Sequence, residues 1–85
     1  MPPLKFLLYG RPDCGLCEEM LEALAALPAA DGIAVEVLDV DAQAGTRVRY
    51  GHKIPVLLYG GELVCHGRLD PEEVHKALRY HRRPV

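Results

Sequence analysis

The sequence predicts a single α/β domain with a four-stranded mixed sheet and helices packed on both of its faces. Three observations support this prediction. A strand-like segment passes directly into a helical pattern, two apolar runs flank a Gly-Gly pair, and the last helix has its own start signals. The chain has 85 residues, of which 49% are hydrophobic, which is enough for one core but not for two. We therefore expect residues 1–85 to form one domain.

The first half of the chain is predicted to form a strand, a helix and a second strand. Leu4–Tyr9 is a short apolar run followed by the turn signal Gly10-Arg11-Pro12-Asp13, which is typical of a buried strand. From Cys14 the apolar residues follow helical spacing, and Pro28 ends that pattern. Ile33–Val40 is rich in β-branched residues and predicts the second strand. Because a helix joins the two strands, we expect them to be parallel, with a right-handed crossover.

A short helix and a hairpin are predicted next. Asp41 is placed to cap a helix that runs from Ala42 to about Tyr50. The apolar runs Val56–Tyr59 and Glu62–His66 are separated by Gly60-Gly61. Both central positions of a type I′ turn need a positive φ, which glycine adopts freely. These two runs are therefore expected to be antiparallel strands.

The last helix has a clear beginning. Asp70 is the expected N-cap, Pro71 occupies the first helical position, and Glu73 completes an Asp-x-x-Glu box. Leu69 and Val74 are spaced to contact one another across the cap. The predicted order of elements is therefore β-α-β-α-β-β-α.

The chemistry of the chain centres on Cys14-Gly15-Leu16-Cys17, at the predicted junction between the first strand and the first helix. Residues at i and i+3 of a helix are neighbours, so the two sulfurs can form a disulfide. The unpaired N–H groups and the dipole of a helix N-terminus stabilise a thiolate. We expect Cys14 to be the nucleophile, Cys17 to be the resolving thiol, and Leu16 to offer an apolar contact to a partner.

Two other interpretations of the cysteine pair remain open, an inert buried pair and a zinc site. A structural zinc needs four ligands, and the remaining candidates are Cys65 and His66. These two residues are adjacent on a predicted strand, so they point to opposite faces. We therefore expect no metal. Cys65 is expected to be either a small core residue or an oxidisable thiol.

Charge and hydropathy exclude several classes of partner. The formal net charge is −2, which creates no field to attract nucleic acid or an anionic membrane. No apolar run approaches the ~20 residues that span a bilayer, and Met1–Lys5 has neither a basic leader nor a separate apolar region. We expect a cytoplasmic, monomeric protein that binds neither nucleic acid nor membranes. In the cytoplasm, we do not expect its three cysteines to form a structural disulfide framework.

Two segments carry a resemblance to a known family. They are Leu8-Tyr9-Gly10-Arg11-Pro12-Asp13-Cys14-Gly15-Leu16-Cys17 and Arg49-Tyr50-Gly51-His52-Lys53-Ile54-Pro55-Val56. From Lys5 to Leu78 the chain resembles the glutaredoxins and thioredoxin-like proteins, and in particular the short glutaredoxin-like group. The resemblance implies a thioredoxin fold and thiol–disulfide oxidoreductase activity on protein disulfides or glutathione mixed disulfides. It also implies a reductant, either glutathione or an enzyme of the thioredoxin-reductase type.

The resemblance further implies a binding site beside the dithiol. Pro55 matches a cis proline that faces the cysteines, and Ile54 would offer its backbone groups to an extended peptide. Arg11 and Lys53 match positions where a basic group meets glutathione. Leu69 and the N-cap Asp70 match the helix start that receives a carboxylate through N–H groups. No cofactor is expected to be bound permanently, and glutathione is expected only as a co-substrate.

A second class of function fits the same residues. The fold could serve as a non-catalytic binding module that holds a partner peptide, glutathione or an iron–sulfur cluster. Reactivity of Cys14 distinguishes this class from the oxidoreductase.

Overall fold

The computed structural model describes residues 4–82. Its strands are β1 (Phe6–Gly10), β2 (Val35–Asp39), β3 (Val56–Tyr59) and β4 (Glu62–His66). Its α-helices are α1 (Gly15–Ala25), α2 (Ala44–Tyr50) and α3 (Pro71–Arg82), and two short 3₁₀ turns are η1 (Pro28–Ala30) and η2 (Val40–Ala42). The predicted order of strands and α-helices is confirmed. The expectation about an N-terminal leader falls partly on residues 1–3, which lie outside the described residues.

The sheet is mixed and has the strand order β2-β1-β3-β4. β2 runs parallel to β1, whereas β3 is antiparallel to both β1 and β4. The register places Gly10 opposite Asp39, and Tyr9 opposite Val56. The carboxyl ends of β1 and β2 therefore lie at the same end of the sheet as Pro55, which immediately precedes β3.

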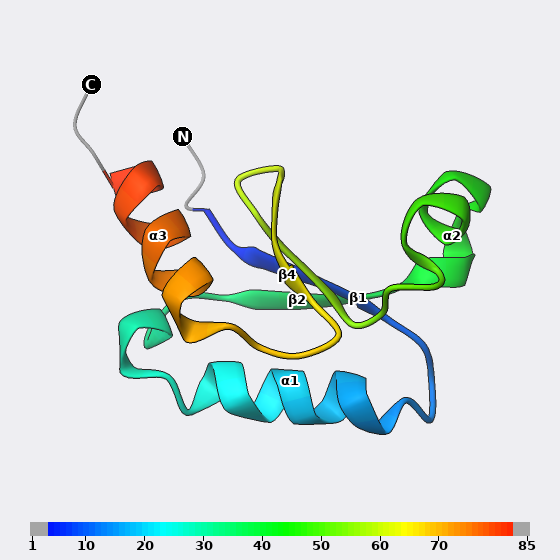
Figure 1. Ribbon diagram of the computed structural model, residues 1–85, viewed down its shortest axis with the longest axis horizontal. Coiled ribbons are helices and arrows are strands. Elements are labelled where there is room, and N and C mark those ends of the chain that lie inside the picture. Colours follow the sequence, from blue (N-terminus) through cyan, green and yellow to red (C-terminus); the bar gives the residue numbers. More distant parts are fainter. Residues whose placement is uncertain (1–3, 83–85) are drawn as a thin grey trace.

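The two faces of the sheet are covered by different helices. Figure 1 shows α1 running along one side of the sheet, with α3 and α2 at opposite ends of the molecule. Between the sheet and the α1 and α3 helices lies a core of buried side chains that includes Phe6, Leu8, Met20, Leu24, Leu57, Val74 and Leu78. On the other face Tyr9 stacks on Tyr50 of α2, with ring centroids 5.5 Å apart. Helices on both faces were predicted, and this arrangement confirms the expectation.

The start of α2 differs from the prediction. Asp41 does not cap this helix, because the chain first makes the 3₁₀ turn η2 and the helix begins after Gln43. The side chain of Asp39 caps η2 by accepting the N–H of Asp41 at 2.9 Å. The carboxylate of Asp41 is therefore free for another contact, which is described with the site.

The hairpin and the last helix begin as the sequence predicts. Gly60 and Gly61 have φ values of 61° and 82°, so both occupy the positive region that the turn requires. The carboxylate of Asp70 accepts the N–H groups of Glu72 at 3.1 Å and of Glu73 at 3.4 Å, which is the pattern of an N-cap. Within residues 4–82, no helix has both the length and the apolar character to cross a membrane.

A close approach between β1 and α1 positions the cysteines. A Cβ atom added to Gly10 would lie 2.8 Å from Sγ and 3.1 Å from Cβ of Cys17. Those distances are shorter than van der Waals contact, so only glycine allows the first turn of α1 to lie this close to the end of β1.

Gly10→Ala should therefore destabilise the protein, because Cys17 or the strand must shift to admit the methyl group. We expect the free energy of unfolding to fall by about 1–3 kcal/mol, which is typical of overpacking in a core. Denaturant unfolding measures this change. Gly15→Ala is the matched control, since a Cβ at Gly15 meets no atom within 4 Å. Equal stability of the two variants would contradict the packing account.

Candidate active site

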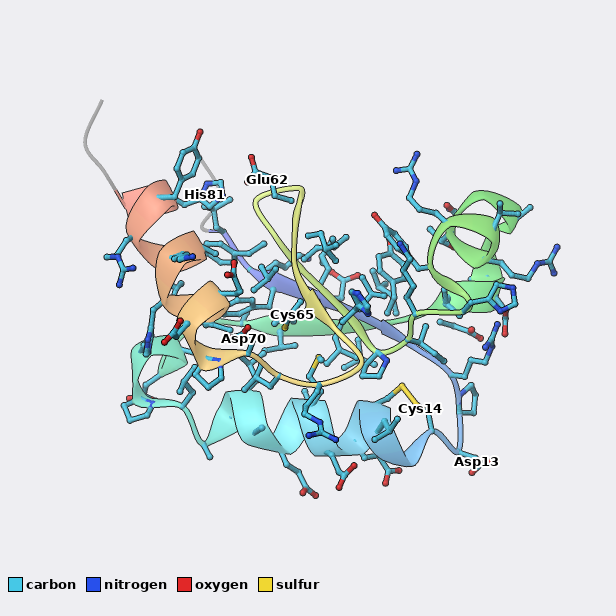
Figure 2. The ribbon with its side chains drawn as sticks, in the orientation of Figure 1. Asp13, Cys14, Glu62, Cys65, Asp70 and His81 are labelled. Atoms are coloured by element: carbon cyan, nitrogen blue, oxygen red, sulfur yellow. A yellow bond between two sulfur atoms is a disulfide. The ribbon has the colours of Figure 1, made fainter. Side chains whose placement is uncertain are left out.

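The two cysteines lie at the N-terminus of α1, at the end of the sheet described above. Cys14 is the N-cap residue and Cys17 lies in the first turn. Their sulfurs form a disulfide, with the Cα atoms 5.2 Å apart (Figure 2). Cys17 is 8% exposed and belongs to the core, whereas Cys14 is half-buried. Of the two sulfurs, an incoming molecule therefore has easier access to that of Cys14.

The first turn of α1 presents a hydrogen-bond donor to Cys14. The backbone N–H of Cys17 donates to Sγ of Cys14 at 3.2 Å. A helix N-terminus carries a partial positive charge, which stabilises an anion on this sulfur. Once the disulfide is reduced, the same geometry favours a thiolate on Cys14 over a thiol.

Arg11 joins three segments around the dithiol. Its Nε and Nη2 atoms donate to the two carboxylate oxygens of Asp41, at 2.7 and 3.1 Å. Its Nη1 donates to the carbonyl oxygen of Gly51 at 3.0 Å. The guanidinium thus ties the loop before Cys14 to the segment after β2 and to the end of α2. We call these three residues the Arg11 clasp.

The Arg11 clasp shifts the ionisation of both charged groups. The hydrogen bond and the positive charge of Arg11 hold the pKa of Asp41 below its ordinary value. The hydrogen bond from Arg11 to Asp41, reinforced by the negative charge of the carboxylate, raises the pKa of Arg11. At neutral pH the guanidinium of Arg11 and the carboxylate of Asp41 are therefore both charged and form an ion pair.

The sequence analysis did not identify Asp41 and Gly51 as partners of Arg11. Part of the signal was present, because residues that follow two adjacent parallel strands meet at one edge of the sheet. Arg11 follows β1 and Asp41 lies shortly after β2. No such sequence signal marks Gly51, which lies at the end of α2 and is brought to Arg11 by the position of that helix.

The segment before β3 contains three of the residues that the resemblance implicates. The Ile54–Pro55 peptide bond is cis, and Pro55 is buried. The carbonyl oxygen of Pro55 accepts the N–H of Gly67 at 2.7 Å, which ties this segment to the end of β4. Ile54 is half-buried and packs against the core, whereas Lys53 is exposed.

The other residues named from the sequence lie between α1 and the start of α3. Leu16 and Leu69 line one cavity of about 300 Å³, together with Arg68. Leu16 is 53% exposed there. Asp70 is exposed, and its carboxylate already occupies the N–H groups of Glu72 and Glu73.

The third cysteine lies apart from the disulfide. Figure 2 shows Cys65 on β4, on the side of Asp70 rather than of Cys14. It is half-buried and packs against the core, as expected of a structural residue. Burial raises the pKa of the Cys65 thiol, although a hydrogen bond from the backbone of Asp70 acts in the opposite direction. Cys65 therefore stays protonated and poorly nucleophilic at neutral pH.

A groove of about 290 Å³ opens on the β2 side of the disulfide. Both cysteines line it, with apolar side chains from β1, α1 and β2 and with the exposed acidic residues Glu18 and Asp39. We call it the dithiol groove. In the described part of the chain, the groove included, no group of three or more His, Cys, Asp or Glu side chains is arranged to hold a metal ion.

Asp41→Asn should weaken the Arg11 clasp in a pH-dependent way. A carboxylate whose pKa is lowered on folding stabilises the protein above its ordinary value of 3.8, and this contribution disappears as pH falls through the lowered pKa. We expect the destabilisation caused by Asp41→Asn to be constant between about pH 7 and 5 and to shrink towards pH 3. Urea unfolding of both proteins at each pH measures it.

Asp31→Asn serves as the control, because Asp31 is an exposed carboxylate at the end of η1. Its effect should be small at every pH. A destabilisation by Asp41→Asn that is as large at pH 3 as at pH 7 would contradict the role assigned to the ion pair.

Three solved structures are similar to this protein. Protein Ne2328 from Nitrosomonas europaea shares 31% sequence identity and superposes with a TM-score of 0.79, covering 89% of this chain and 92% of that one. Target protein XcR50 from X. campestris shares 29% identity with a TM-score of 0.67, covering 93% of this chain and 99% of that one. The thioredoxin-like protein BC3987 shares 26% identity with a TM-score of 0.57, covering 86% of this chain and 99% of that one.

The chain also matches a protein-family model over most of its length. No curated protein matches the chain significantly. The glutaredoxin-like domain (DUF836), however, matches residues 5–79, which include every strand and the cysteine pair. The superposition on the thioredoxin-like protein BC3987 supports the same fold. The chain therefore belongs to the glutaredoxin-like domain family and has the thioredoxin fold.

Proposed function

We propose that this protein is a thiol–disulfide oxidoreductase in which Cys14 is the nucleophile and Cys17 the resolving thiol. The observation that carries the proposal is the position of the pair. Cys14 caps α1, receives the N–H of Cys17 and is the more exposed of the two sulfurs. An accessible sulfur at a helix N-terminus with a second thiol at bonding distance is the arrangement that disulfide exchange requires.

The reaction begins with the reduced protein. The Cys14 thiolate attacks one sulfur of a substrate disulfide, so that a new S–S bond forms and the substrate bond breaks. The departing sulfur leaves as a thiolate and takes up a proton from water. The first turn of α1 supports this step because the N–H of Cys17 and the helix dipole stabilise negative charge on the Cys14 sulfur.

Cys17 completes the exchange. Its sulfur is close enough to displace the substrate from Cys14, which releases the second substrate thiol and leaves the Cys14–Cys17 disulfide. The substrate has then gained two electrons and the protein has lost two. The burial of Cys17 supports this assignment, because a buried thiol reacts with a neighbour more readily than with a molecule in solution.

The surroundings favour protein disulfides over glutathione as the main substrate. Glutathione carries a net negative charge, and the start of α3 carries Asp70, Glu72 and Glu73. Asp70 also occupies two of the N–H groups that would receive a carboxylate. Arg11, the basic residue nearest the dithiol in sequence, is held by Asp41. Lys53 and Arg68 are the remaining cations close in sequence to Pro55 and Leu69 that could meet a glutathione carboxylate.

Other parts of the site support peptide binding. We propose that Leu16 and Leu69 contact the apolar part of a substrate, and that Ile54 pairs with its backbone beside Pro55. The electrons would come from glutathione or from an enzyme of the thioredoxin-reductase type. The protein is proposed to act as a monomer in the cytoplasm.

Intact mass after incubation with oxidised glutathione tests the assignment of the two sulfurs. In a Cys65→Ser background, the reduced dithiol protein should lose two hydrogens. Cys17→Ser should gain one glutathione on Cys14, because the mixed disulfide can no longer be resolved. Cys14→Ser should gain little or none, because Cys17 is buried.

The controls separate the enzyme from the binding module. Unfolding the Cys14→Ser protein should expose Cys17 and allow glutathione to be added. Unchanged masses for both native single variants and for the dithiol protein would mean that the pair is inert, and would favour the non-catalytic module.

A further inference from the structure

The dithiol groove lies on the side of the disulfide that faces away from Pro55. β1 is flanked by β2 on one side and by β3 on the other, and Pro55 immediately precedes β3. The groove is lined instead by residues of β2, including Val37 and Asp39, together with both cysteines. It is therefore a second approach to the same sulfurs.

The lining of the groove is apolar and open to water. Val37 of β2 is 58% exposed, and Leu21 of α1 is 36% exposed. Val37 is paired with Leu8 of β1, so it belongs to the face of the sheet that α1 covers only in part. Two branched apolar side chains thus border a cavity that reaches Cys14 and Cys17. An apolar side chain placed there would remove both from water.

The charged side chains around the groove determine whether it attracts a basic or an acidic ligand. Glu18 at the start of α1 and Asp39 at the end of β2 both line it and are exposed. Arg11 also lines it, but its charge is balanced by Asp41 in the Arg11 clasp. Arg11 also interacts with the charge of Asp39, but the sum of these charges is negative, which attracts a basic group and repels an anion such as glutathione.

An extended polypeptide fits this surface better than a compact molecule does. β2 is an edge strand, with β1 as its one neighbour in the described sheet. The outer backbone groups of an edge strand can pair with an added strand. A chain lying along β2 would carry a side chain over Val37 and bring its cysteine towards Cys14.

We propose that the dithiol groove binds one of the two segments joined in a disulfide substrate, taking an extended segment with an apolar residue beside its cysteine and a basic residue next to these, while the other segment lies beside Ile54 and Pro55. This inference rests on the proposed function and names its substrate class. The Cys14 thiolate attacks the sulfur of the bound segment, the former partner thiolate leaves and is protonated, and Cys17 then releases the segment as a thiol. The protein ends as the disulfide, and the substrate has gained two electrons.

Two peptides joined to glutathione by a disulfide test the proposal through turnover. Both carry a Cys-Leu core, flanked by lysines in one and by glutamates in the other. We expect kcat/KM to favour the lysine peptide by about fivefold or more at low salt, and less at high salt. Glu18→Lys should abolish that preference. Glu62→Lys should keep it, because Glu62 lies at the tip of the hairpin, far from Cys14 (Figure 2).

The apolar part is tested in the same way. Val37→Asn should lower kcat/KM for both peptides severalfold. Val48→Asn is the matched control, since Val48 on α2 is 80% exposed and does not line the groove. Equal rates with the two peptides in the wild type, or equal effects of Glu18→Lys and Glu62→Lys, would overturn the proposal.

A binding experiment separates this proposal from the proposed function. The same two peptides, with serine in place of cysteine, are titrated into the oxidised protein while the methyl NMR signals of Val37 and Leu21 are followed. Shifts of these signals with the lysine peptide, and weaker ones with the glutamate peptide, support the groove even if no turnover occurs. Such a result without turnover would contradict the oxidoreductase alone. Methyl signals that respond to neither peptide would overturn the groove.

Discussion

The close packing of α1 against the end of β1 is the constraint on which the site depends. Gly10 leaves room for the Cys17 sulfur, so the first turn of the helix can pack closely against the end of the strand. As a result, Cys14 caps the helix and its sulfur accepts the N–H of Cys17, while the side chain of Cys17 belongs to the core. One local contact thus sets the different exposure of the two sulfurs and the electrostatic environment of Cys14.

The parallel pairing of β1 and β2 extends this local arrangement across the sheet. It brings the segments that follow both strands together, where Arg11 binds Asp41 and the carbonyl of Gly51. Pro55 lies at this same end of the sheet, but next to β3, on the opposite side of β1 from β2. The dithiol is therefore flanked by two different surfaces, the loop before β3 and the dithiol groove beside β2. Because Arg11 is paired with Asp41, the groove side is acidic, and the proposed preference for protein substrates over glutathione rests on this feature.

Local signals explain why much of the fold could be predicted from the sequence. The Gly60-Gly61 turn and the Asp70 cap depend on residues close together in the chain, and so does the strand-to-helix junction at Cys14. The features that could not be predicted are contacts between distant segments, or places where a competing local structure forms instead of the expected one. Asp41 was expected to cap α2, but the turn η2 delays that helix. The β-branched pattern around Val37 predicted a strand correctly, yet only the edge position of β2 explains why this valine is exposed.

The most direct test of the account measures the ionisation of Cys14 itself. The reduced protein, with Cys65 replaced by serine, is alkylated with iodoacetamide at a series of pH values, and the modified residue is identified by peptide mapping. Because the N-terminus of α1 stabilises the thiolate, the rate should be half-maximal well below about pH 8.5, the ordinary value for cysteine, with modification on Cys14. Half-maximal reaction at or above that pH, or modification mainly on Cys17, would contradict the central role assigned to the helix N-terminus.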